Sequence, residues 1–220
     1  MARFIEHQKA LELRKQGKSY SEIKKVLGIS KSTLSDWLHD YPLTYEQIDK
    51  LSYHNATRIE RYRTTMREKK DTKFKIAYDK QKKMIFPINN HNLFIAGLFL
   101  YWGEGSKSKY DRICLSNTNP AIIKFFIYWS TQSLRISKEK VRIQLHLYSD
   151  MNIRKELLYW SKLINIPLKH FYKPYIKNSL TTNINHKGCF GHGTCNVNIN
   201  DVNIDRIVLS SIKAVEDKYK

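Results

Sequence analysis

One carboxylate in the middle of the chain stands in a setting suited to chemistry on an anion. Glu104 lies between Gly103 and Gly105, directly after an apolar segment, and Lys107 and Lys109 follow it closely. Two glycines relax the backbone and leave the acid exposed at the end of a helix. A carboxylate placed there is costly unless it meets a cation. The alternative is an acid that only accepts hydrogen bonds at a turn.

A second group of polar residues lies on one side of an expected strand. Residues 141–148 alternate strictly between apolar and polar, which predicts a half-buried strand. Its polar side carries Arg142, Gln144 and His146. Hydrogen-bonding side chains on a twisted strand suit a groove of duplex DNA. The alternative is the wet side of an ordinary sheet.

Two further patterns invite chemical interpretations that we do not favour. His186, Cys189, His192 and Cys195 recur every three residues, and all four types bind zinc. Zinc sites commonly use two separated pairs of ligands, so the sequence favours a glycine-rich hairpin instead. The Glu104-x-x-Lys107 spacing also approaches the Glu-x-Lys motif of another nuclease fold. That motif lies on a strand and is one residue shorter.

The charge of the chain indicates a polyanionic partner. Its 220 residues hold 39 Lys and Arg against 20 Asp and Glu, a formal net charge of +19. Residues 1–43, 44–86 and 87–220 carry +3, +6 and +10, so the charge is not confined to one tail. Nucleic acid is the usual partner of such a protein.

Composition also excludes several protein classes. With 41% hydrophobic residues the chain can bury a core, which argues against a disordered basic protein. The longest apolar run, Leu93 to Trp102, is about half of the roughly 20 residues needed to span a bilayer. Three cysteines and a charged N-terminus favour reduced thiols and no secretion signal. We therefore expect a cytoplasmic, nucleoid-associated protein without a membrane partner.

Residues 1–43 predict a domain of three short helices. Ser19-x-x-Glu22 has capping-box spacing, and the helix that follows is expected to bury Ile23, Val26 and Leu27 before Gly28. After a short turn, Ser30 begins a third helix that ends near Leu38. Two helices joined by a three-residue turn with glycine form a helix-turn-helix. The segment resembles the helix-turn-helix of transposases and bacterial regulators; the alternative is a packing module without a DNA role.

Residues 44–86 and 87–220 predict two further parts. The first is basic, begins with a capping box at Thr44 and has too few apolar residues for a core, so a solvated helix or a flexible basic linker is expected. Non-specific contact with phosphates, joining two DNA-binding ends, is compatible with either. In the second, helices are expected near 92–103, 120–134, 150–164 and 203 onward, with strands near 112–116, 141–148 and 194–199. The fold class is therefore α+β.

The segment from Ile95 to Phe99, followed by Gly103-Glu104-Gly105, resembles the signature of the LAGLIDADG homing endonucleases. The resemblance covers residues 87–220 and implies an αββαββα domain with an antiparallel saddle sheet. In that family the signature helix joins two copies, and the acid at its end binds a divalent metal at the scissile phosphates. The resemblance therefore implies Glu104 as the metal ligand and Mg²⁺ or a similar cation as the cofactor.

Phosphodiester cleavage adds expectations for the other residues. One carboxylate is a poor magnesium site, so two copies of Glu104 in a homodimer are expected to share it. Lys107, Lys109 and Lys173 suit stabilisation of negative charge, and Gln144 or His146 suits positioning of water. The alternative is a regulator that binds DNA without cutting it. The residues expected to contact double-stranded DNA are Lys31, Ser32, Thr33, Ser35, Lys107, Lys109, Arg112, Arg142, Gln144, His146 and Lys173.

Overall fold

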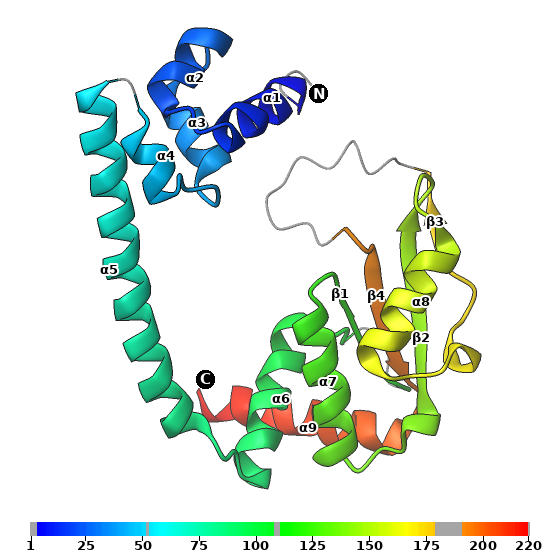
Figure 1. The fold of residues 1–220 in the computed structure, drawn as a ribbon. Coiled ribbons are helices and arrows are strands. Elements are labelled where there is room, and N and C mark those ends of the chain that lie inside the picture. Colours follow the sequence, from blue (N-terminus) through cyan, green and yellow to red (C-terminus); the bar gives the residue numbers. More distant parts are fainter. Residues whose placement is uncertain (1–3, 52, 108–110, 179–190, 220) are drawn as a thin grey trace. The chain divides into compact units, whose positions relative to one another are not determined.

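The computed structural model describes residues 4–51, 53–107, 111–178 and 191–219. The chain divides into two compact units, Met1–Pro87 and Ile88–Lys220. Helices fill the first unit, and a four-stranded sheet with helices forms the second, so the fold is α+β (Figure 1). Within the described ranges, no helix combines the length and apolar character that a membrane span requires.

The first unit contains five helices among its described residues. They are α1 (Phe4–Lys15), α2 (Tyr20–Leu27), α3 (Lys31–Leu38), α4 (Tyr45–Asp49) and α5 (His54–Ile85). Caps set their starts as expected: Ser19 and Glu22 form a capping box at α2, and Thr44 and Gln47 form another at α4. The linker region is therefore helical, but it holds two helices.

The core of the first unit joins α1, α2 and α3. Its centre is formed by Ala10, Ile23, Leu34 and Leu38, each with no exposed surface. The expectation for Val26 was wrong, because this side chain is 68% exposed. Tyr20, Ile23 and Leu27 form the inward-facing stripe of α2. This stripe is narrow, so Val26, three positions after Ile23, falls at its edge.

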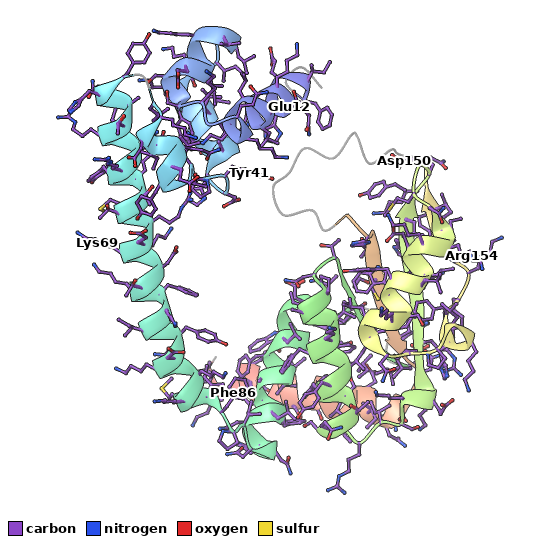
Figure 2. The ribbon with its side chains drawn as sticks, viewed as in Figure 1. Glu12, Tyr41, Lys69, Phe86, Asp150 and Arg154 are labelled. Carbon is purple, nitrogen blue, oxygen red and sulfur yellow. The ribbon has the colours of Figure 1, made fainter. Side chains whose placement is uncertain are left out.

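Most of α5 is a solvated helix. Its residues 71–85 are all exposed, and Figure 2 shows the Lys69 side chain extending away from the helix. Its first two turns, in contrast, pack on the helix-turn-helix. The buried Glu60 accepts a hydrogen bond from the buried Arg14 of α1, with 2.8 Å between Nη2 and Oε2. This contact fixes the start of α5 to the three-helix core.

The second unit alternates helices with strands. Its elements are α6 (Asn90–Glu104), β1 (Ile113–Asn117), α7 (Pro120–Gln132), the 3-10 helix η1 (Lys138–Lys140), β2 (Val141–Tyr148), α8 (Ile153–Ile164), the 3-10 helix η2 (Leu168–His170), β3 (Tyr175–Lys177), β4 (Thr194–Ile199) and α9 (Val202–Lys218). The strand order is β1-β4-β2-β3.

Two features of this sheet differ from the expected αββαββα saddle. β4 pairs antiparallel with β1 and β2, but β3 pairs parallel with β2, so the sheet is mixed. One strand, not two, lies between α6 and α7 in the described chain. The reason for the parallel pair is that α8 crosses over between β2 and β3, and a helical crossover returns the chain in the same direction.

The core of the second unit lies on one face of the sheet. Val141, Ile143, Leu145 and Leu147 of β2 are completely buried, and the polar residues between them are half-buried, as the alternation predicts. α6 and α7 pack on β1, and α8 adds Trp160 to the same core. The other face of the sheet carries the half-buried polar residues of β2.

Candidate nucleic-acid interfaces

The helix-turn-helix presents a polar face on α3. Gly28 ends α2 with a φ of 69°, a left-handed conformation that glycine adopts without strain, and Ser30 caps α3 by accepting from the Thr33 amide at 3.1 Å. Lys31, Ser32 and Ser35 are exposed. The Thr33 hydroxyl is half-buried and lies 2.9 Å from the Ser30 hydroxyl, so it is engaged in the cap.

The second candidate surface is the polar face of the sheet, opposite the core. Cα pairing places Gln144 opposite Asn196, and Asn196 opposite Ser116, so one polar row crosses β2, β4 and β1. A neighbouring row pairs His146 with Thr194 and with Tyr175. Amides, hydroxyls and rings in rows of this kind can donate to or accept from the edges of bases.

The individual side chains of this face are already held by neighbours. The Gln144 amide donates to the Lys173 carbonyl at 3.2 Å, and the His146 ring meets the edge of Tyr175 at 5.3 Å between centroids. Burial, followed by the charge of Lys177, lowers the pKa of His146. His146 is therefore more often neutral than an ordinary histidine and can accept a hydrogen bond.

Two arginines border the sheet face. Arg142 lies 2.9 Å from His170 Nδ1 and donates to the Glu139 carbonyl at 2.6 Å. Arg112 pairs with its neighbour Asp111 at 3.1 Å. Both guanidinium groups thus have local partners and are held near the strands rather than extended.

Glu104 lies at the end of α6, beside the outer edge of β1. Its carboxylate is exposed, and Oε2 accepts from Asn117 Nδ2 at 3.2 Å. The chain after it pairs with β1 through Gly105 and Leu115. A Cβ on Gly105 would lie 2.3 Å from the Tyr101 ring, so glycine is required for this close approach.

Lys107 is close to Glu104 in sequence but is engaged elsewhere. Its ammonium group donates to the Trp102 carbonyl at 2.7 Å and to the Gly105 carbonyl at 2.9 Å. It therefore satisfies carbonyls at the C-terminal end of α6, where a cation is favourable. Lys109 lies outside the described residues.

Glu104 and the polar residues of β2 do not form one compact site within a protomer. Gly105 lies beside β1, and the order β1-β4-β2 places β2 three inter-strand steps from it. At about 4.8 Å a step this is roughly 14 Å. Gln144 and His146 are therefore placed for contact with a ligand on the sheet face, away from the carboxylate of their own chain.

Two residues of the histidine–cysteine segment, His186 and Cys189, lie outside the described residues. The ring of His192 stacks on Tyr159 at 3.5 Å, and its Nδ1 lies 2.6 Å from the buried Glu156 carboxylate. Cys195 is completely buried, and burial raises the pKa of its thiol. Among the described residues, no three His, Cys, Asp or Glu side chains lie close enough together to hold a metal ion.

Residues 2–46 match the family model of the Homeodomain-like domain. The match spans α1, α2 and α3 and the start of α4. No curated protein and no solved structure matches the chain. The homeodomain-like segment is thus a helix-turn-helix by both geometry and sequence, a kind of domain that suggests DNA binding.

Sequence reasoning missed one carboxylate of the second unit. Asp205, in the first turns of α9, is 1% exposed, and neither of its oxygens has a hydrogen-bond partner within the described chain. Burial first, and the charge of Asp111 second, raise the pKa of Asp205. Helical periodicity can identify Asp205 as an inward position. The sequence does not show whether a cation lies close to its carboxylate.

Replacing Asp205 with asparagine is expected to stabilise the second unit at neutral pH by roughly 1–3 kcal/mol. Because the folded state holds the Asp205 proton more tightly than the unfolded chain does, its stability falls as pH rises above the ordinary range for aspartate. The gain should therefore be present at pH 7 and nearly absent at about pH 4. Unfolding curves at both pH values measure it.

The exposed Asp217 of the same helix gives a matched control. It pairs with Lys213 at 2.9 Å, and Asp217→Asn should change stability by less than about 0.5 kcal/mol. A gain from Asp205→Asn that is equal at pH 4 and pH 7 would contradict the assignment of a charge penalty to Asp205.

Proposed function

We propose that this protein is a sequence-specific, homodimeric endonuclease of double-stranded DNA that resembles the LAGLIDADG homing endonucleases. The observation that carries the proposal is an exposed strip of α6 among the described residues, formed by Phe99 and Gly103 and followed by an exposed carboxylate. The apolar side chain of Phe99 is 49% exposed, a Cβ at Gly103 would have no neighbouring atom within 4 Å among the described residues, and Glu104 follows at the helix end.

Two faces of α6 are assigned different packing partners. Gly97 admits Trp129 of α7, since a Cβ at Gly97 would lie 2.1 Å from the indole ring. Ala96, Phe99 and Gly103 lie on another face, at spacings of three and four residues. Small residues and one aromatic ring suit close packing against a second copy of α6. A two-fold contact of this kind brings the two Glu104 carboxylates together.

The donor set at Glu104 fits half of a magnesium site. Its ligand is a carboxylate oxygen, which Mg²⁺ prefers, and Glu104 of a second copy would supply the other carboxylate, with waters and substrate phosphates as the remaining ligands. When bound, the metal supplies Lewis acidity and lowers the pKa of water. Glu104 holds it, and the Asn117 amide orients the Glu104 carboxylate through the 3.2 Å hydrogen bond.

Substrate binding is assigned to two surfaces. The homeodomain-like segment reads bases with Lys31, Ser32 and Ser35 of α3, while the sheet face contributes Arg142, Gln144 and His146. Lys173 and Arg112 border that face and provide phosphate contacts. Two such surfaces on each chain suit a long recognition site.

The proposal is tested by incubating the full chain with a randomised library of supercoiled plasmids and Mg²⁺, with an equal sample in EDTA. Nicked or linear products at a recurring sequence, seen with Mg²⁺ and absent with EDTA, support it. Tight binding of selected duplexes without any nicking, under Mg²⁺ and under Mn²⁺, contradicts it.

Phe99→Asp is expected to abolish dimer formation through α6. A carboxylate placed in the middle of the apolar contact loses its hydration without gaining a partner, which raises the dissociation constant at least about 100-fold. Sedimentation velocity over a range of concentrations measures the change. Tyr128→Asp, at a 51% exposed position of α7, serves as the control and should leave association unchanged.

One observation favours the alternative, a regulator that binds DNA without cleaving it. The Lys107 ammonium is engaged by two backbone carbonyls at the end of α6, so the base nearest to Glu104 has a structural task. A regulator needs only the helix-turn-helix and the sheet face. The plasmid experiment separates the two functions, because a regulator binds its selected site and leaves it intact.

A further inference from the structure

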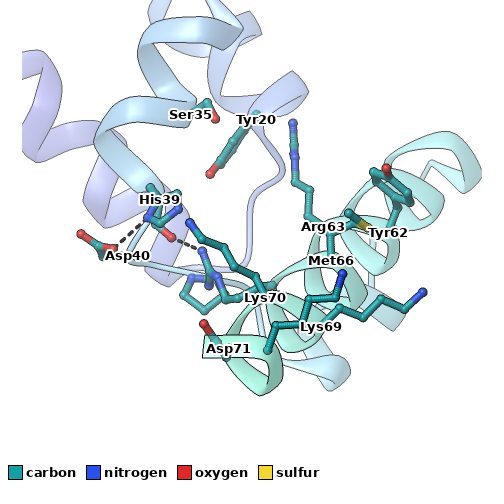
Figure 3. A pocket seen from close by; sticks show the side chains of 13 residues that line it. Tyr20, Ser35, His39, Asp40, Tyr62, Arg63, Met66, Lys69, Lys70 and Asp71 are labelled. Carbon is teal, nitrogen blue, oxygen red and sulfur yellow. Dashed lines mark hydrogen bonds and ion pairs between the residues drawn. The ribbon is translucent and has the colours of Figure 1, made fainter. Parts of the chain in front are cut away.

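A basic groove lies between the recognition helix and α5. It is formed by α3, the residues that follow it and the stretch of α5 from Tyr62 to Lys73, and it encloses about 890 Å³ (Figure 3). Ser35 and His39 lie on one wall, with the Tyr20 ring between the walls. The groove therefore opens beside the surface that contacts bases.

The α5 wall is strongly positive. Five Lys and Arg line the groove against two Asp, and three of them (Lys69, Lys70 and Lys73) have no acidic partner among the described residues. The aspartates are Asp40, which pairs with His39 at 2.9 Å, and Asp71 of α5 itself. Three unpaired ammonium groups on one helical stretch attract an anion.

The basic wall is held in place by buried contacts. Glu60 binds Arg14 of α1 at 2.8 Å and Arg63 of α5 at 2.6 Å. The guanidinium groups of Arg14 and Arg63 lie 4.6 and 4.2 Å from the centre of the Tyr20 ring. Arg67 donates to the carbonyl of His39, across the groove. The positive wall is thus fixed relative to α3 before any ligand binds.

The length of the wall indicates a polymeric anion. Tyr62 and Lys73 are eleven residues apart, which is about 16 Å along a helix. One strand of a duplex places about five phosphates in that axial distance, at 3.4 Å each. A single phosphate or a small nucleotide would leave most of the cations without a partner.

We infer that this groove holds the sugar–phosphate backbone of the DNA strand that borders the base-reading face of α3. The inference rests on DNA binding by the homeodomain-like segment and does not depend on cleavage. Lys69, Lys70 and Lys73 neutralise phosphates, and Ser35 and His39 add hydrogen bonds from the opposite wall. α5 is therefore a second part of the DNA-binding surface rather than only a connector.

The test compares two triple variants of the full chain. Lys69, Lys70 and Lys73 are changed to glutamine in one, and the exposed Lys75, Lys80 and Lys83 of the same helix in the other. Fluorescence anisotropy measures the dissociation constant for a 30-base-pair random-sequence duplex from 50 to 300 mM NaCl. Circular dichroism melts check that both variants keep the stability of the natural chain.

The groove variant should bind about 10- to 100-fold more weakly at 0.1 M salt, and its slope of log K against log salt should be smaller by about 2–3. The control variant should lose less than half as much binding free energy as the groove variant. Equal losses in both variants, or no loss in the groove variant, would overturn the inference. A loss confined to an RNA duplex of the same sequence would also overturn it.

If the natural chain binds no duplex at all, the proposed DNA-binding function itself is wrong. The two failures are therefore distinguishable from the same titrations.

Discussion

Glu104→Gln should lower the rate of Mg²⁺-dependent nicking at least about 100-fold, with little change in DNA affinity. Glutamine keeps the size of the side chain and its contact with Asn117, but it removes the negative charge that holds the cation. In a homodimer both carboxylates are lost together. The measurement is the single-turnover nicking rate on a duplex selected by the natural chain, with affinity determined separately by anisotropy.

The control for this experiment is Glu12→Gln, a charge-matched change at an exposed position of α1. It should nick at the rate of the natural chain. If Glu104→Gln nicks as fast as the control, the assignment of Glu104 as the metal ligand is wrong even if the protein is a nuclease. If its DNA affinity falls in parallel with the rate, Glu104 acts in binding or folding instead.

Glu60→Gln should destabilise the first unit by about 3–5 kcal/mol. Arg14 and Glu60 are each about 3–4% exposed, so removal of the anion leaves a guanidinium group buried without a counter-charge. Arg14 also donates to the carbonyls of Tyr41 and Lys18, which hold it in place and prevent it from reaching solvent. Urea unfolding followed by circular dichroism measures the loss.

Two variants separate a buried ion pair from an ordinary loss of charge. Asp49→Asn breaks the Arg61–Asp49 pair, which has a similar distance (2.7 Å against 2.8 Å for Arg14–Glu60) but is about 60% exposed, and should cost less than about 1 kcal/mol. The double variant Arg14→Met/Glu60→Met removes both charges and should recover much of the stability lost in Glu60→Gln. If Glu60→Gln loses no more stability than Asp49→Asn, the prediction is wrong.

The same buried pair links stability to the proposed phosphate groove. Because Glu60 also binds Arg63 on the groove wall, its loss should loosen α5 from the helix-turn-helix. Stability and DNA affinity should then fall together in Glu60→Gln. The lysine variants of α5, in contrast, change affinity alone, since those side chains are exposed.

Local sequence signals determined the elements that position both surfaces. Capping residues act within four positions of themselves, so Ser19, Ser30 and Thr44 start helices where the sequence predicts them. Alternation along residues 141–148 is likewise local, and it correctly separates the buried and half-buried sides of β2. The helix-turn-helix, the basic helical linker and the polar strand face follow from such signals.

The sequence also drew attention to Glu104, but only the tertiary structure showed its surroundings. The amide of Asn117 that binds it comes from the far end of β1, and the side of α6 that stays exposed in the described structure depends on how α7, α9 and β1 pack against this helix. Small residues occur on both faces of α6, at Ala96, Gly97 and Gly103. Periodicity cannot say which of them meets α7 and which remains free.

What the sequence by itself determined is a basic α+β protein with a helix-turn-helix and one acid at the end of an apolar helix. Tertiary structure alone decided the parallel pairing of β3 with β2, the unpartnered burial of Asp205 and the contact of Glu60 with Arg14. These features join residues far apart in the chain. Their geometry depends on how whole elements pack, because only packing decides which buried charges meet a partner.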